Sequence, residues 1–181
     1  AGDLLLREVS TRLNALSRFS ETFYRLGGDE FAFLSSGLTE AAAVSRAREI
    51  SDSISKPYTI NNQLIKIATC VGIVLSDNER RSDYLYKFAD LALYEAKKEG
   101  SQQIKVFRQR MLQKLQESRT LENDMARAIE NDEFIVYYQP IVNSVSKEIY
   151  GYEALIRWMH PVKGMLSPDS FIFAAEKTGM I

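Results

Sequence analysis

The N-terminal part of the chain alternates between stretches where apolar residues recur at helical spacing and short apolar runs typical of strands. Leu6, Val9 and Leu13, for example, share one face of a helix predicted over residues 3–17. A hairpin that turns at Asn61-Asn62, with a long second strand, is predicted within residues 58–75. The other predicted elements are strands over 22–26, 30–34 and 103–107, a helix between the N-cap Thr39 and Pro57, and a helix between Ser82 and Gly100.

The pattern changes after residue 107. Residues 108–120 are polar and charged with few apolar anchors, and we interpret them as a helical linker, after which Thr120 is expected to cap a short helix. Two strands, "EFIVYYQPIV" and "EIYGYEALIRW", precede a loop with proline and glycine and a helix from about 168 to 177. The sequence therefore predicts an α/β chain with two domain parts, 1–107 and 121–181, and no internal repeat.

The composition of the chain argues against nucleic-acid binding and against a membrane span. Apolar residues make up 45% and charged residues 26% of the 181 residues, which is an ordinary globular balance. With 23 Lys and Arg against 24 Asp and Glu, the net charge of −1 provides no basic field for a nucleic acid partner. No apolar run approaches the ~20 residues of a membrane span, and no signal peptide is recognisable. We expect a cytoplasmic segment, in a protein that other sequence could tether to a membrane.

Single cysteine and histidine residues limit the possible chemistry. Cys70 stands alone, which excludes a disulfide framework, and His160 alone excludes a multi-histidine zinc site and disfavours a Ser-His-Asp triad. His160 precedes Pro161 and is expected to form hydrogen bonds within a loop rather than to catalyse. Metal chemistry in this chain would therefore depend on carboxylates.

The stretch "RLGGDEF" has two interpretations. As a hairpin turn, it needs only the positive φ that Gly27 and Gly28 tolerate. As a ligand site, glycines without Cβ would let a triphosphate approach the backbone N–H groups, and Asp29 and Glu30 would hold Mg²⁺. As consecutive strand residues, the two acids would point to opposite faces, so only one of them would face the phosphates.

"RLGGDEF" followed by "ADLALYEAKKEG" resembles the GGDEF domain of diguanylate cyclases, which join two GTP molecules into cyclic di-GMP and act as dimers. The resemblance implies a nucleotidyl-cyclase-like α/β sandwich and a homodimer. It places Gly27 and Gly28 at the phosphates and assigns Asp29 and Glu30 to Mg²⁺ (or Mn²⁺) binding and catalysis.

Two further residues gain a role only from this resemblance. Lys97 would reach the triphosphate, although a solvated lysine on a helix face is the alternative. Asp3 would read the guanine edge, although it could also cap the first helix.

The chain also departs from the GGDEF pattern. A strand with another metal-binding aspartate is expected to precede residue 1, and Ser101 stands where many members have arginine. The inhibitory-site motif Arg-x-x-Asp is here "RFSE", with Arg18 and Glu21, so product inhibition is doubtful. Without the family, these two residues would be interpreted as a surface salt pair worth about 0–1 kcal/mol.

"YEALIRW" carries a second candidate site. On a strand, Glu153, Leu155 and Arg157 share one face, with Glu153 and Arg157 roughly 13 Å apart. A carboxylate and a guanidinium on one face suit a metal ion and a ligand phosphate in the same cleft. The alternative is a buried Glu–Arg pair that satisfies itself, which contributes little to stability.

"YYQPIV", "YGYEALIRW" and the following "HPVKGMLSPDSFIFAAEKTGMI" resemble the start of an EAL domain, a phosphodiesterase that opens cyclic di-GMP to linear pGpG. The resemblance implies the first strands of a TIM-type barrel. It makes Glu153 a catalytic metal ligand, and it places Arg157 at a phosphate and Gln139 at the ligand.

Both resemblances together predict part of a tandem GGDEF–EAL signal-transduction protein that makes cyclic di-GMP, hydrolyses it, or does both. The chain alone is expected to be inactive, because one glutamate cannot hold the two-metal hydrolase site. The alternative is a catalytically silent module that binds GTP or cyclic di-GMP and regulates another domain.

Overall fold

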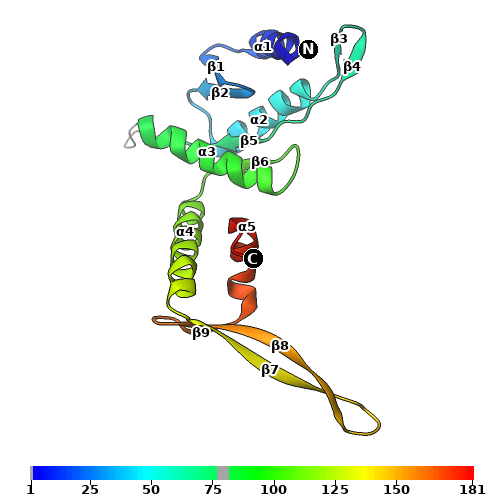
Figure 1. The fold of residues 1–181 in the computed structure, drawn as a ribbon. Coiled ribbons are helices and arrows are strands. Elements are labelled where there is room, and N and C mark those ends of the chain that lie inside the picture. Colours follow the sequence, from blue (N-terminus) through cyan, green and yellow to red (C-terminus); the bar gives the residue numbers. More distant parts are fainter. Residues whose placement is uncertain (1, 77–81) are drawn as a thin grey trace. The chain divides into compact units, whose positions relative to one another are not determined.

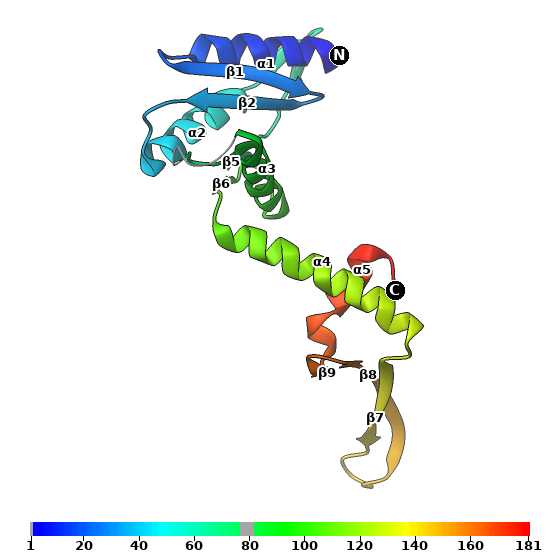
Figure 2. The ribbon, with the colours of Figure 1, turned by 90° about the vertical axis from the view of Figure 1, so that its left-hand side faces the viewer.

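The computed structural model describes residues 2–76 and 82–181 (Figures 1 and 2). It divides into two compact units, residues 1–111 and 112–181, which we call the N-terminal and C-terminal units. The N-terminal unit contains α1 Gly2–Leu16, β1 Glu21–Gly27, β2 Glu30–Ser35, α2 Glu40–Ile54, β3 Tyr58–Ile60, β4 Gln63–Ile65, β5 Val71–Ile73, α3 Ser82–Lys98 and β6 Ile104–Val106. Helix α4 Gln109–Glu130 crosses the boundary, and the C-terminal unit continues with β7 Phe134–Val142, β8 Ile149–His160, β9 Gly164–Leu166, the 3₁₀ helix η1 Pro168–Ser170 and α5 Ile172–Thr178.

In the N-terminal unit, strands pair in twos. β1–β2 and β3–β4 are antiparallel hairpins, and β5 and β6 form a parallel pair connected through α3. Figure 2 shows β1 and β2 side by side next to α1. The core joins α1, the end of α2 and β3, through the buried residues Val9, Leu13, Ile54, Tyr58 and Ile60.

Two local predictions are confirmed and one is wrong. The Thr39 side chain caps α2 by accepting from the Ala42 N–H, and Asn61 and Asn62 adopt the positive φ values, 49° and 61°, of a tight hairpin. The long second strand of this hairpin does not form, because β4 ends at Ile65. Ile65 pairs with Tyr58, and the next position on the partner strand is Pro57, which has no N–H to continue the ladder.

In the C-terminal unit, β7 and β8 form a long antiparallel hairpin, and the short β9 pairs with β8 (Figure 1). The core consists of residues from α4, β8 and the C-terminal helix with its approach, namely Met125, Ala128, Trp158, Phe171 and Ala175. The polar stretch 108–120 is helical as predicted, but the cap at Thr120 is wrong, because α4 runs through this residue without a break. Nothing at this point interrupts the helix, since neither glycine nor proline occurs within α4.

The helix predicted at 168–177 is split into η1 and α5, and Gly179, with a φ of 71°, ends α5 in the left-handed conformation. Strand β9 was not predicted, because its three residues are too few for a recognisable alternation. In the part of the chain that the structure describes, no helix has the length and apolar character needed to cross a membrane.

Candidate functional site

The first candidate site is the turn between β1 and β2. Gly27 lies opposite Glu30 in the strand register, so Gly28 and Asp29 form the connection, and Gly28 has a φ of 50°. All four residues are exposed. Asp29 therefore lies in the turn and not on a strand, and the prediction that Asp29 and Glu30 occupy consecutive strand positions is wrong. The reason is that the hairpin closes through Gly28 and Asp29 together.

The carboxylates at this turn fit one kind of metal site. Asp29 and Glu30 supply two exposed carboxylates on adjacent residues. Within residues 2–76 and 82–181, no group of three or more His, Cys, Asp or Glu side chains could hold an ion. Mg²⁺ often binds to one or two carboxylates together with substrate phosphates. The turn thus fits an ion that arrives with a nucleotide, and it does not fit an ion held by protein alone.

Asp3 and Lys97 lie at opposite ends of different helices. Asp3 is inside the first turn of α1, so its alternative role as an N-cap is wrong. Its negative charge is instead stabilised by the positive end of the helix dipole. Lys97 is exposed in the last turn of α3, where a cation is favoured. No hydrogen bond or ion pair described for residues 2–76 and 82–181 joins either side chain to the turn.

Arg18 and Glu21 do not form the surface pair that their spacing predicts. The Glu21 side chain is only 5% exposed, and its carboxylate accepts from Nε of Arg46 at 2.9 Å and from Nη2 at 2.7 Å. Arg18 bonds through its guanidinium to Glu49 and meets Glu21 only through its backbone N–H. Arg46, 25 residues away, was not foreseen, because a short motif does not show which distant helix packs against it.

Arg18, Glu21, Arg46 and Glu49 form a network of ion pairs and hydrogen bonds. The Arg46 side chain is 3% exposed, and its guanidinium also donates to the Leu16 carbonyl at 2.5 Å. Hydrogen bonds from Arg46 hold the pKa of the Glu21 carboxyl below its usual range, and they do the same for Glu49. The ion pairs tie α2 to the start of β1, but not every donor is satisfied, since Nη1 of Arg46 is buried without a hydrogen-bond partner and lies 2.9 Å from the Glu49 carboxylate.

The second candidate site lies on one face of the β7–β8 hairpin. Gln139 is directly opposite Glu153 in the register, Tyr137 is opposite Leu155, and Ile135 is opposite Arg157. Directly opposite residues share one face of a sheet. The pairing therefore brings Gln139 to the face on which alternation alone already placed Glu153 and Arg157.

The other face of the hairpin packs into the core only at the end near Trp158. Phe134, Ile156 and Trp158 lie there against α4 and the segment of Phe171, and Trp158 is fully buried. Gln139 and Glu153 are exposed, and Arg157 is half-buried. Farther along the hairpin, Val136, Tyr138 and Tyr152 of this second face are exposed, so at the level of Gln139 and Glu153 both faces of the two strands are open.

Glu153 and Arg157 do not form an ion pair with each other among the described residues, so the alternative of a self-satisfied pair is wrong. The Arg157 guanidinium lies 6.0 Å from the centre of the Tyr137 ring and donates to the Ile156 carbonyl at 2.8 Å. The contact of Tyr137 with Arg157 was not predicted, because an aromatic residue next to "YQP" in the sequence looks the same as a residue of the core. With one carboxylate on this face, the described residues do not fit a two-metal centre.

His160 has the loop role that its sequence context predicts. Its Nδ1 accepts from the backbone N–H groups of Val162 and Lys163, and its Nε2 lies 3.3 Å from the Asp124 carboxylate. Because Nδ1 accepts two hydrogen bonds, the proton of the neutral ring is on Nε2 and faces Asp124. The hydrogen bond with His160 lowers the pKa of the Asp124 carboxyl.

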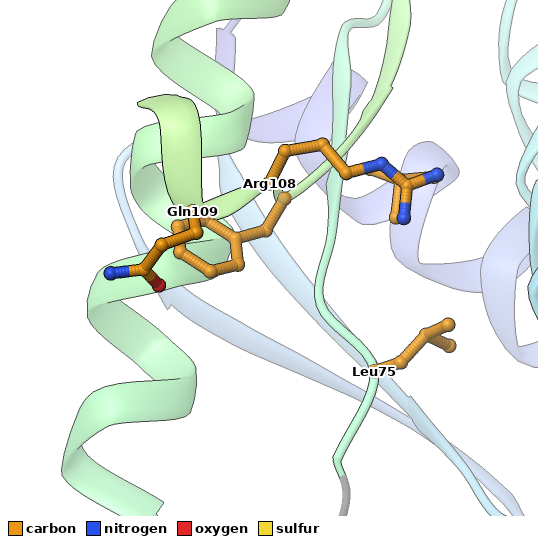
Figure 3. A pocket seen from close by; sticks show the side chains of 5 residues that line it. Leu75, Arg108 and Gln109 are labelled. Carbon is orange, nitrogen blue, oxygen red and sulfur yellow. The ribbon is translucent and has the colours of Figure 1, made fainter. Parts of the chain in front are cut away.

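A shallow hollow of about 250 Å³ lies where β6 ends and α4 begins (Figure 3). Its lining is Leu75, Val106, Phe107, Arg108 and Gln109. None of the residues that the motifs single out lines it, and Arg108 is engaged in an ion pair with Glu40. This hollow is therefore not part of either candidate site.

Comparison with known proteins shows which families the two motifs belong to. Residues 1–103 match the family described as "Diguanylate cyclase, GGDEF domain", and residues 122–181 match the EAL domain. The chain belongs to the tandem GGDEF–EAL family. Its sequence is 38% identical over 182 residues to the bifunctional diguanylate cyclase/cyclic di-GMP phosphodiesterase MucR of Pseudomonas aeruginosa, covering 99% of this chain and 26% of MucR. It is 34% identical to the cyclic di-GMP phosphodiesterase PdeR of Escherichia coli, covering 99% of this chain and 27% of PdeR.

Solved structures agree with the predicted α/β fold of the GGDEF part. The GGDEF domain of TpbB (YfiN) from Pseudomonas aeruginosa is 30% identical, with a TM-score of 0.59 over 64% of this chain and 69% of that one. An EAL/GGDEF domain protein from M. capsulatus is also 30% identical, with a TM-score of 0.54 over 59% of this chain and 70% of that one. The chain spans about a quarter of the length of the curated relatives it matches. Enzymes of both families depend on metal ions.

Proposed function

We propose that the protein containing this chain turns over the second messenger cyclic di-GMP, making it from GTP at the GGDEF motif, hydrolysing it to pGpG at the EAL motif, or both. The observation that carries the proposal is that the key residues of each motif are exposed or half-buried, with one motif in each unit. The similarity to MucR, which is a bifunctional diguanylate cyclase/cyclic di-GMP phosphodiesterase, supports the proposal of both reactions.

At the GGDEF motif, we assign GTP phosphates to the backbone of Gly27 and Gly28. Neither glycine has an atom within 4 Å of the place where a Cβ would stand, so the backbone can be approached from outside. Asp29 and Glu30 would bind Mg²⁺ or Mn²⁺ together with the phosphates, Lys97 would add a positive charge, and Asp3 would contact guanine. The bound ion would neutralise phosphate charge and orient the triphosphate.

At the EAL motif, we assign cyclic di-GMP to the open face of the β7–β8 hairpin. Glu153 would bind a metal ion, Gln139 would hydrogen-bond to the ligand, and Arg157 would contact a phosphate. The directly opposed positions of Gln139 and Glu153 support a shared ligand. A guanidinium suits the phosphate because its N–H groups match two oxygens at once.

Within this protein, we propose that the chain of 181 residues binds nucleotides without turning them over. The described residues provide at most two neighbouring carboxylates at either motif, whereas two-metal hydrolysis needs ligands for both ions. We also propose a homodimer, in which each copy presents one GTP, and a cytoplasmic location, with which the single cysteine agrees.

The test is a product assay with Mg²⁺ or Mn²⁺ and either GTP or cyclic di-GMP, followed by chromatography. In the longer protein, Asp29→Ala is expected to abolish cyclic di-GMP formation, and Glu153→Ala is expected to abolish pGpG formation. The chain of 181 residues is expected to give neither product. Formation of pGpG by this chain that disappears in Glu153→Ala would contradict the binding-only role, since the chain or a second copy would then complete the metal site.

A further inference from the structure

Arg25, two residues before Gly27, makes an unusual contact with the turn. Its Nε and Nη2 both donate to the carbonyl oxygen of Gly28, at 3.1 and 2.8 Å. The strand register shifts between Arg25 and Gly27, so one extra residue lies between them. The guanidinium thus spans the bulge in β1 and holds the carbonyl of Gly28, the residue of the connection with a left-handed φ.

The direction of this carbonyl fixes the direction of the next N–H. The peptide bond between Gly28 and Asp29 is trans, and in a planar trans peptide the C=O and N–H point in opposite directions. Because Arg25 holds the Gly28 oxygen on its own side, the Asp29 N–H points to the other side of the turn. Without Arg25, the peptide plane between two exposed turn residues could rotate.

The contact also leaves the acids of the motif available. Among the ion pairs of the described residues, none joins Arg25 to Asp29 or Glu30. The guanidinium is therefore occupied with a backbone oxygen and does not compete with a metal ion for the two carboxylates. Arginine is suited to this task because its planar fork makes two hydrogen bonds to one acceptor, which an ammonium does not.

We propose that Arg25 is a positioning residue that sets the Gly28–Asp29 peptide so that the Asp29 N–H faces the nucleotide phosphates. This inference rests on the proposed function for its ligand, but the orientation of the peptide is a separate claim. A backbone N–H aimed at an anion contributes without reorganisation at the moment of binding. Arg25 itself need not touch the nucleotide.

The test uses the whole chain of 181 residues labelled with ¹⁵N. Arg25→Gln removes the guanidinium, Arg25→Lys keeps the charge but loses the fork, and Arg48→Gln, an exposed arginine on α2, is the matched control. In both Arg25 variants we expect a shifted Asp29 amide resonance. We also expect about tenfold weaker binding of a non-hydrolysable GTP analogue with Mg²⁺, as for a lost hydrogen bond to a charged group.

Several outcomes would overturn the proposal. An unchanged Asp29 amide in Arg25→Gln would mean that the peptide is held by other contacts. Wild-type affinity in Arg25→Lys would mean that only the charge matters. If the unmodified chain did not bind the GTP analogue, the proposed function at this turn would fail, and the Asp29 amide would still decide whether Arg25 orients the peptide.

Discussion

Gly72→Ala is expected to destabilise the N-terminal unit by about 3 kcal/mol, the upper end of the usual cost of overpacking, because the new atom meets backbone. A Cβ at Gly72 would lie 2.2 Å from the carbonyl oxygen of Ala89 and 2.4 Å from the backbone nitrogen of Leu93. Both atoms belong to the backbone of α3, so a side-chain rotation cannot relieve the clash. The helix would have to move away from β5.

Chemical denaturation followed by circular dichroism measures this loss, and hydrogen exchange over β5 and α3 locates it. Gly151→Ala is a suitable control, because Gly151 also lies in a strand and its nearest neighbouring atom would be 4.0 Å from the new Cβ. An equal, small effect of both substitutions would contradict the close packing of α3 on β5. Since α3 carries Lys97, a displaced helix is also expected to weaken GTP binding.

Trp158→Ala is expected to destabilise the C-terminal unit by about 3–5 kcal/mol, the range for deleting a large buried aromatic side chain. Trp158 is fully buried and lies between the rings of Phe134, Phe171 and His160. Its indole N–H also donates to the Glu133 carboxylate at 2.9 Å, and the substitution removes this donor. The cavity and the lost hydrogen bond both lower the free energy of unfolding.

Hydrogen exchange over β8 and α5 reports this change without depending on tryptophan fluorescence. Met159→Ala is the matched control, because the Met159 side chain is 43% exposed and its removal is expected to destabilise the unit only slightly. Trp158→Phe is expected to fall between the two, since it keeps most of the ring volume but loses the hydrogen bond. Unchanged protection in Trp158→Ala would show that the C-terminal unit does not depend on this core.

Local features of both sites could be predicted from the sequence. Gly28 marks the turn because it tolerates a positive φ, and alternation along a strand places Glu153 and Arg157 on one face. The expectation of a positive φ at Gly27 is wrong, because this residue is the last one of β1. The caps and turns at Thr39 and Asn61 follow from the same short-range chemistry.

Features that depend on how segments pair could not be predicted in this way. The opposed positions of Gln139 and Glu153 depend on the register of two strands, which neither strand determines alone. The capture of Glu21 by Arg46 depends on packing between β1 and α2. The Arg25 contact lies within four residues, but only the bulge and the orientation of the Gly28 carbonyl reveal it.

Isothermal titration of this chain with each ligand tests the central claim, that it carries two separate nucleotide sites. With Mg²⁺ present, Asp29→Ala is expected to weaken binding of the non-hydrolysable GTP analogue and leave cyclic di-GMP binding unchanged. Glu153→Ala is expected to do the reverse, because the two residues lie in different compact units. If either substitution weakened the binding of both ligands equally, or if neither substitution changed the affinity for any ligand, the assignment of one nucleotide site to each motif would be wrong.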